Sequence, residues 1–289
     1  MYLPAPQPFE LDLRWLQAQA FRWCERDGWY YGFVSGHLIK VRNCRDGIEF
    51  RSNPSEDSLA ADVRSYFRLD QDIAAVHDAL REDRELRGLL GTYGGMRVLR
   101  QDPWECLVAY ICSQRNGIKG IRRILDKLAG CYGEPLTLDA VELYSFPSPQ
   151  RLAAVGESKL KSLDLGLNRG SRIHEVAEHI REGILDLSAL ARWPHPQARG
   201  FLMSYEHIGP KIADCVCLFA LGMDAAFPVD TNIGKGLERY GKKYTPGAEN
   251  ANLMHWVSEQ FGANAGYAGQ LLFLEQLEKS DNATPTRCP

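Results

Sequence analysis

The segment around Lys211 contains the residues of this chain that are best suited to covalent chemistry. It reads Tyr205-Glu206-His207-Ile208-Gly209-Pro210-Lys211-Ile212-Ala213-Asp214-Cys215. Gly209 lies in a short hairpin between two predicted helices, and Pro210 is typical of the first position of a helix. The start of a helix presents unpaired N–H groups and the positive end of its dipole, which suit a phosphate. Lys211 is therefore predicted to lie where a nucleic-acid backbone can bind.

Lys211 also shares a helix face with two apolar residues. Lys211, Cys215 and Phe219 follow one another at intervals of four residues, so they lie on one side of a helix. A lysine acts as a nucleophile only when it is neutral, and a helix N-terminus and partial burial both disfavour the ammonium form. This arrangement suits Schiff-base chemistry.

A carboxylate follows nineteen residues later, in the sequence Phe227-Pro228-Val229-Asp230-Thr231-Asn232. Asp230 is predicted to be the N-cap of a helix over 231–240. If it faces Lys211, it can stabilise a cationic sugar and take part in proton transfer. Taken singly, a lysine in the first turn of a helix is most often a solvated side chain, and an aspartate before a helix is most often only a cap.

The elements that position these residues fall into two parts, an α+β organisation. Short strands are predicted at 20–26, 29–34, 37–42 and 47–51, separated by the turn sequences Asp27-Gly28, Ser35-Gly36 and Asp46-Gly47. Helical periodicity is predicted from Ser58 onward, with a frayed tail over 280–289. Helices are expected at 104–114, 117–128, 168–181, 196–205, 210–221, 231–240, 250–261 and 265–279. We predict a β-rich N-terminal domain over 1–95 and a helical domain over 96–289, with the hairpin at about 202–222.

Composition limits the class of protein. The 289 residues are 45% hydrophobic and 25% charged, with a formal net charge of −3, which is ordinary for a soluble globular protein. This charge argues against a protein that coats nucleic acid, although a local basic patch remains compatible with it. No apolar run is long enough to span a bilayer and no secretion signal begins the chain, so we expect an intracellular protein that is neither secreted nor bound to membranes.

The eight cysteines show no C-x-x-C pair and no spacing typical of zinc or iron–sulfur sites. We therefore expect no metal and no cofactor, and interpret the cysteines as reduced, mostly buried thiols.

Several segments, in order along the chain, resemble the 8-oxoguanine DNA glycosylases of the helix-hairpin-helix superfamily. The hairpin with Gly-Pro-Lys-Ile-Ala-Asp-Cys and the later Pro-Val-Asp are the most specific. The resemblance extends over about residues 15–277. The other matching segments are Ala20-Phe21-Arg22-Trp23, Ser65-Tyr66-Phe67-Arg68-Leu69-Asp70, Arg100-Gln101-Asp102-Pro103-Trp104-Glu105-Cys106-Leu107, Ile111-Cys112-Ser113, Ala265-Gly266-Tyr267-Ala268 and Leu272-Phe273.

The resemblance implies both a fold and an activity. An N-terminal antiparallel β module (TBP-like) would pack on a two-part helical domain, with a pocket for a base extruded from the duplex. Lys211 would attack C1′ of an oxidised purine nucleotide and form a Schiff base, and β-elimination would then cut the strand, while Asp230 supports the transition state. The partner would be double-stranded DNA containing a damaged base, bound by a monomer. The location would be the bacterial cytoplasm (nucleoid) or the eukaryotic nucleus.

The resemblance also implies the pocket, in which this chain departs from the family at two positions. Cys215 and Phe273 match the residues on the two faces of the extruded base. Ala18 stands where the family has the glycine whose carbonyl contacts the base. Gly269 takes the place of the glutamine that reads the base, and Gln270 follows it. Phe219 and Pro228 complete the candidate pocket residues.

The residues that would contact DNA depart further from the family. Arg115 takes the place of the asparagine that contacts the orphaned cytosine, and Asn116 follows it. Arg169 takes the place of the wedge tyrosine, and each of these arginines would meet either a base or a phosphate. The arginines that also hold the cytosine align near Gly120 and Gly170. His207, Gly209 and Asn232 are the remaining candidates; His207 replaces a hairpin glycine, and Asn232 replaces a histidine beside the carboxylate.

Three alternatives remain open. The chain could be a glycosylase for an alkylated or other lesion, in a broad pocket left by Gly269. It could be a non-catalytic module that binds DNA lesions, although such a module would need neither Lys211 nor Asp230. It could also be a Schiff-base lyase for small carbonyl compounds, which would need no hairpin for phosphate.

Overall fold

The N-terminal part of the chain forms a five-stranded antiparallel sheet with the strand order β1-β5-β4-β3-β2. The computed structural model describes residues 1–52, 57–246, 250–279 and 286–288. The strands are β1 (Tyr2–Pro4), β2 (Cys24–Arg26), β3 (Trp29–Val34), β4 (His37–Cys44) and β5 (Gly47–Ser52). The predicted α+β class, with an antiparallel N-terminal sheet, is confirmed.

The predicted hairpin turns follow from their sequences. Both residues of Asp27-Gly28 and of Ser35-Gly36 have positive φ, the conformation that a two-residue hairpin loop requires. Two local predictions were wrong. Residues 20–23 are not strand, because helix α1 (Leu13–Gln19) precedes them and Ala20 caps it. The edge strand β1 was not predicted, since its three residues depend on pairing with β5.

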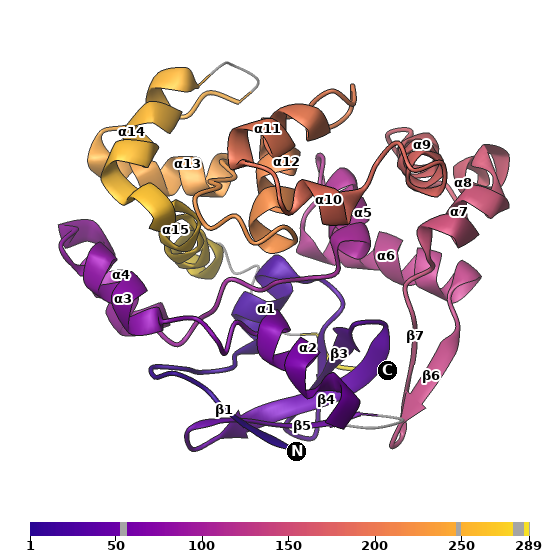
Figure 1. Cartoon of the computed structure of the whole chain (residues 1–289), viewed down its shortest axis with the longest axis horizontal. Coiled ribbons are helices and arrows are strands. Elements are labelled where there is room, and N and C mark those ends of the chain that lie inside the picture. Colours follow the sequence, from indigo (N-terminus) through magenta and orange to yellow (C-terminus); the bar gives the residue numbers. More distant parts are fainter. Residues whose placement is uncertain (53–56, 247–249, 280–285, 289) are drawn as a thin grey trace.

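Helices make up most of the remainder (Figure 1). They are α2 (Ala60–Tyr66), α3 (Ile73–Arg81), α4 (Arg84–Tyr93), α5 (Pro103–Cys112), α6 (Ile118–Tyr132), α7 (Pro149–Val155), α8 (Glu157–Ser162), α9 (Arg169–Arg181), α10 (Leu187–Leu190), α11 (His195–Leu202), α12 (Pro210–Phe219), α13 (Thr231–Leu237), α14 (Ala251–Phe261) and α15 (Ala265–Lys279). Short 3-10 turns lie at Asp57–Leu59, Glu238–Tyr240 and Gly262–Asn264. No helix in the described ranges has the length and apolarity needed to cross a bilayer.

A second hairpin interrupts the helical part and corrects the prediction of uninterrupted helices. Strands β6 (Pro135–Leu138) and β7 (Val141–Tyr144) pair with each other after α6. This hairpin packs beside the N-terminal sheet, where Val141 shares a small apolar cluster with Cys24 and Tyr31 (Figure 1). A contact with a distant sheet stabilises the hairpin, so helical periodicity could not predict it.

The expectation that all cysteines are reduced was also wrong. Cys24 on β2 and Cys288 near the C-terminus form a disulfide. Residues 286–288 lie along β2, where the Glu25 N–H donates to the Thr286 carbonyl at 3.0 Å and the Cys288 N–H to the Glu25 carbonyl at 2.9 Å. This part of the predicted frayed tail is therefore held against the sheet, while 280–285 and 289 lie outside the described residues.

One continuous hydrophobic core joins the sheet to the helices. At its centre, α5 contacts α12 on one side and α9 on the other (Figure 1). Asp102 is the N-cap of α5 and Pro103 lies in its first turn, one residue before the predicted start of this helix. The predicted domain boundary near residue 95 stays a prediction.

Candidate active site

Lys211 lies in the first turn of α12, and its amine points toward the end of α5. Gly209 is the N-cap of α12 and Pro210 its first residue, as the sequence predicted. Lys211 Nζ donates to Ser113 Oγ at 3.2 Å and lies 4.9 Å from the centre of the Tyr110 ring. The amine is therefore half-buried between two helices, beside N–H groups that the first turn of α12 leaves unpaired.

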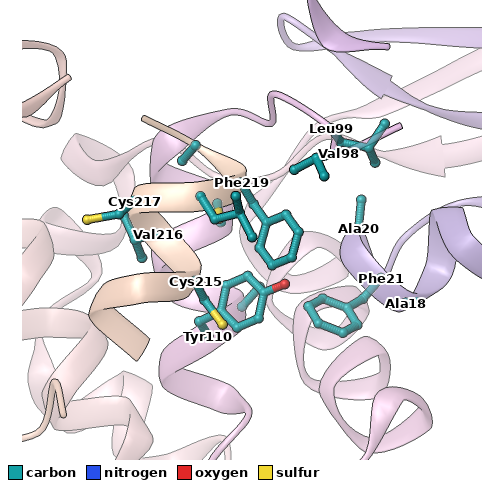
Figure 2. Packing of buried hydrophobic residues seen from close by; sticks show 14 of the residues in the cluster. Ala18, Ala20, Phe21, Val98, Leu99, Tyr110, Cys215, Val216, Cys217 and Phe219 are labelled. Atoms are coloured by element: carbon teal, nitrogen blue, oxygen red, sulfur yellow. The ribbon is translucent and has the colours of Figure 1, made fainter. Parts of the chain in front are cut away.

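Cys215 and Phe219 follow Lys211 along the same face of α12, as predicted. Both side chains are only 2% exposed, and Phe219 stacks on Tyr110 with ring centres 5.6 Å apart and planes 9° apart. Figure 2 shows Cys215 pointing toward Tyr110, whereas Cys217 points away from it. Burial raises the pKa of the Cys215 thiol to about 12, although the Lys211 charge opposes this rise. Cys215 is therefore a neutral thiol beside the amine.

Asp230 is the N-cap of α13, as predicted. Its Oδ1 accepts hydrogen bonds from the N–H groups of Asn232 and Ile233, both at 2.9 Å. Among the described residues, no protein hydrogen bond to the second oxygen, Oδ2, is recorded. The charges of Asp230 and Lys211 both act on the pKa of the Cys215 thiol, with opposite signs. Both charged groups therefore act electrostatically on the same thiol.

The segment after Ala18 forms another wall of the site. Ala18 is buried at the end of α1, and the following Phe21 packs edge-on against Tyr110 with ring centres 5.7 Å apart (Figure 2). The Gln19 carbonyl accepts hydrogen bonds from Gln101 Nε2 at 2.9 Å and from Tyr110 Oη at 3.3 Å. These bonds fix the backbone that carries the Ala18 carbonyl.

The interpretation of Gly269 as the opening of a broad pocket was wrong. A Cβ at this position would lie 2.9 Å from the Phe227 ring, so Gly269 faces packed protein. Gln270 is 3% exposed, and no hydrogen bond of its side chain is recorded within the described ranges. Phe273, one turn further along α15, is partly exposed, and Pro228 is buried.

The candidate DNA contacts on the loop after α5 differ in exposure. Arg115 is exposed and has a φ of +50°. Asn116 Nδ2 instead donates to the Cys112 carbonyl at 3.3 Å. The Asn116 side chain occupies the space beside Gly120, where a Cβ would lie 1.8 Å from Asn116 Oδ1. Of these two candidates, only Arg115 extends freely from the loop.

Arg169 does not project toward a ligand. Its side chain is 6% exposed; Nη1 donates to the Leu165 carbonyl at 2.7 Å and Nη2 to the Gln114 carbonyl at 2.5 Å. The prediction that Arg169 contacts a base or a phosphate is therefore wrong for this conformation, because two backbone carbonyls hold the guanidinium inside the protein.

The remaining candidates lie around the hairpin. His207 is buried, with Nδ1 3.4 Å from Glu175, and burial together with the Arg172 charge lowers its pKa to about 4. The His207 ring therefore faces α9, whereas Gly209 is open, with nothing near its missing side chain. Asn232 is half-buried beside Asp230.

Sequence reasoning missed several polar residues that organise the site. The Ser113 hydroxyl accepts a hydrogen bond from the Lys211 amine, and Gln101 donates one to the Gln19 carbonyl. Gln114 links the loop after α5 to Arg169 at the start of α9 and to the His207 carbonyl in the hairpin before α12. Their only sequence signal is their place in the segment around α5 that resembles the family.

Comparisons with known proteins agree with this arrangement. Residues 2–107 match the family model described as "8-oxoguanine DNA glycosylase, N-terminal domain", and residues 108–258 match "HhH-GPD superfamily base excision DNA repair protein". The N-glycosylase/DNA lyase OGG1 of Arabidopsis thaliana is 29% identical over 283 residues, which cover 92% of this chain and 77% of the relative. The N-glycosylase/DNA lyase of Saccharomyces cerevisiae is 29% identical over 269 residues, covering 80% of this chain and 70% of the relative.

A solved structure is similar over nearly the whole chain. The Clostridium acetobutylicum 8-oxoguanine glycosylase/lyase, in complex with double-stranded DNA containing cytosine opposite 8-oxoguanine, superposes with a TM-score of 0.85 at 26% identity. The match covers 94% of this chain and 93% of the other. With its antiparallel N-terminal sheet, its hairpin before Lys211 and these matches, the chain belongs to the HhH-GPD superfamily of base-excision DNA repair proteins.

Proposed function

We propose that this protein is a bifunctional DNA glycosylase that excises 8-oxoguanine and then cleaves the abasic strand. One observation carries the proposal: the Lys211 amine lies beside the Tyr110 ring at the end of α5, and its charge and that of Asp230 both act on the pKa of the buried Cys215 thiol. A purely binding module needs neither group, and the N-glycosylase/DNA lyase relatives support the same activity.

The geometry suits a reaction in two stages. In the first stage, the Lys211 Nζ lone pair attacks C1′ of the extruded nucleotide; the C1′–N9 bond breaks, and the base leaves with the bond electrons and takes up a proton. The free Oδ2 of Asp230 stabilises the positive charge that develops on the sugar. Sugar-ring opening then gives a Schiff base between Nζ and C1′.

In the second stage, loss of a C2′ proton expels the 3′-phosphate, which breaks the C3′–O bond and cuts the strand. Water then hydrolyses the imine and returns Lys211 to its free amine. Asp230 would exchange protons in these steps; the hydrogen bonds that its Oδ1 accepts from the first turn of α13 fix the orientation of its carboxylate.

The walls of the site suit a flat, extruded base. By resemblance to the family, the neutral Cys215 thiol would lie against one face of the base, and the partly exposed Phe273 ring would stack on the other. The hydrogen bonds to the Gln19 carbonyl fix the backbone at this point, so the Ala18 carbonyl is a fixed hydrogen-bond acceptor. Gln270 supplies a buried amide that carries no recorded hydrogen bond in the described part of the chain, so it is suited to reading an edge of the base.

The test is single-turnover incubation with duplexes that carry 8-oxoguanine opposite each of the four bases, with borohydride present to trap the imine. We expect release of the base and a trapped covalent complex, and the fastest duplex gives the opposite-base preference. Release without trapping would contradict the lysine mechanism. No release from any of the four duplexes would contradict 8-oxoguanine as the substrate.

A glycosylase for a different lesion is the second candidate function. The Ala18 methyl group stands where the family has glycine, and Gly269 supplies no amide where the family has glutamine. Both changes alter how the edge of a base is recognised. A trapped adduct with an abasic site, but none with 8-oxoguanine, would favour this candidate.

A further inference from the structure

Ser113 lies at the end of α5, and the last turn of that helix fixes its side chain. It is the C-cap residue of α5, and its backbone N–H donates to the Tyr110 carbonyl at 3.1 Å. The Ser113 hydroxyl donates to the same carbonyl at 2.7 Å. A hydroxyl has one proton, and this bond uses it, so Oγ offers only lone pairs to other groups. Ser113 Oγ is therefore a hydrogen-bond acceptor in a fixed position.

The group that uses this acceptor is the amine of Lys211. Its Nζ donates to Ser113 Oγ at 3.2 Å and lies 4.9 Å from the centre of the Tyr110 ring. The face of an aromatic ring carries negative charge, so it attracts N–H groups and repels a lone pair. Two residues from one turn of α5 therefore act on the same amine, and both attract its hydrogens.

These contacts restrict the direction of the lone pair once the amine is neutral. A neutral lysine amine carries two N–H groups and one lone pair at the free corners of a tetrahedron around Nζ. When Ser113 accepts one N–H and the Tyr110 ring attracts the other, the lone pair takes the remaining corner, which faces away from the last turn of α5. Ser113 cannot mask this lone pair, because its only hydroxyl proton is bonded to the Tyr110 carbonyl.

We propose that Ser113 is a positioning residue for the nucleophile: its hydroxyl holds one N–H of Lys211, so that the lone pair of the amine is aimed at C1′ of the bound nucleotide. A lysine amine sits on a flexible four-carbon stem, and attack is efficient only when the reacting atoms are close and their orbitals are aligned. Ser113 forms no bond to the substrate and acts through Lys211 alone. This inference rests on the proposed glycosylase and lyase function.

The test measures imine formation on a duplex that already carries an abasic site, so that base recognition and base release do not affect the rate. The Lys211 amine adds to the C1′ aldehyde, loss of water gives the imine, and borohydride traps it. Ser113→Ala removes the acceptor, whereas Ser113→Thr keeps a hydroxyl that can bond to the carbonyl three residues earlier. Ser162→Ala is the matched control, because the Ser162 hydroxyl at the end of α8 donates to the Lys159 carbonyl at 2.7 Å in the same local pattern.

At saturating enzyme, we expect Ser113→Ala to form the trapped complex about tenfold more slowly than the wild type, because a misdirected amine loses rate and keeps affinity. Binding to a duplex with a stable abasic-site analogue should change less than about twofold, and the melting temperature should fall by less than about 3 °C. Ser113→Thr should keep most of the rate, and Ser162→Ala all of it. Ser113→Cys should be as slow as Ser113→Ala, because a thiol has nearly the size of the hydroxyl but is a weak acceptor.

A wild-type trapping rate in Ser113→Ala or in Ser113→Cys would overturn the proposal. An equal loss in Ser113→Thr and Ser113→Ala would overturn it too, because threonine retains the hydroxyl. A loss that disappears at saturating enzyme would assign Ser113 to DNA binding and would also exclude the positioning role. These results differ from a failure of the proposed function, in which the wild type itself would trap no complex and the lyase function and this inference would both be wrong.

Discussion

Replacing Asp230 with asparagine tests whether this residue is a catalytic group or only a helix cap. Asparagine caps helices as well as aspartate, and its side-chain oxygen can still accept the Asn232 and Ile233 N–H groups. The lost charge at the start of α13 costs about 0.3–1 kcal/mol. Since the unfolding entropy of a 289-residue chain is about 0.6 kcal/mol/K, the melting temperature should fall by about 2 °C at most.

The loss of rate should be much larger. If the free Oδ2 stabilises the developing cation, its removal costs about 3–4 kcal/mol of transition-state stabilisation, a 10²- to 10³-fold slower base excision. Single-turnover kinetics measure this loss, and titration with a duplex carrying a stable abasic-site analogue measures binding, which should change less than about threefold. Thermal unfolding of the same variant measures the capping effect separately.

Asp186 provides the matched control for this prediction. It caps α10 by accepting the Ala189 N–H at 2.9 Å, and it is not among the candidate site residues. Asp186→Asn should leave the excision rate unchanged. If Asp230→Asn lowers the melting temperature and keeps the wild-type rate, Asp230 is only a cap and the assigned role is refuted.

Three further changes have distinct expected outcomes. Lys211→Gln should abolish borohydride trapping and keep DNA binding, while exposed Lys159→Gln should affect neither; a trapped adduct in the Lys211 variant would exclude this amine. The pKa of His207 is lowered to about 4, so the unfolded chain binds more protons and the wild type should lose about 2–3 kcal/mol of unfolding free energy as the pH falls from 6.5 to 4. His207→Gln should lack this loss in urea titrations, and identical pH profiles would exclude the histidine as its source. Cys288→Ser should destabilise the fold by about 2–4 kcal/mol, or about 5 °C in melting temperature, and reductant should do the same to the wild type alone.

The parts of the fold that could be predicted are those whose causes are local in sequence. Asp230 and Asp102 cap the helices that they precede, and Pro210 begins α12, because caps and first turns are set by residues within one turn. The Asp27-Gly28 turn follows from two residues that accept positive φ. The same local signals placed Lys211 and Asp230 correctly at the starts of their helices.

The features that could not be predicted depend on partners far away in the sequence. The Cys24–Cys288 disulfide joins residues 264 positions apart, and the spacing of cysteines in the sequence does not predict such a pair. Strand β1 exists because β5 pairs with it. The orientation of Gly269 is set by the Phe227 ring, and the burial of Arg169 by the Gln114 carbonyl. The resemblance to the family identified Gly269 and Arg169 as candidate site residues. Contacts with residues distant in the sequence decide whether each of them faces a ligand or the interior of the protein.

This chain departs from the family at Gly120, Arg169 and Gly170, the positions that the resemblance assigns to contacts around the opposite base. The structural effects of these three departures depend on one another. Gly120 leaves room for the Asn116 side chain, and Gly170 lets α9 approach α8, since a Cβ there would lie 2.6 Å from the Leu160 carbonyl. Arg169, between the two loops, is then free to hold them by their backbone carbonyls. An arginine placed at position 170 alone would therefore separate α8 from α9 before it reached a base. The exposed side chains of Arg115, between α5 and α6, and of Leu167, between α8 and α9, remain available for a ligand that Arg169 cannot reach in this conformation.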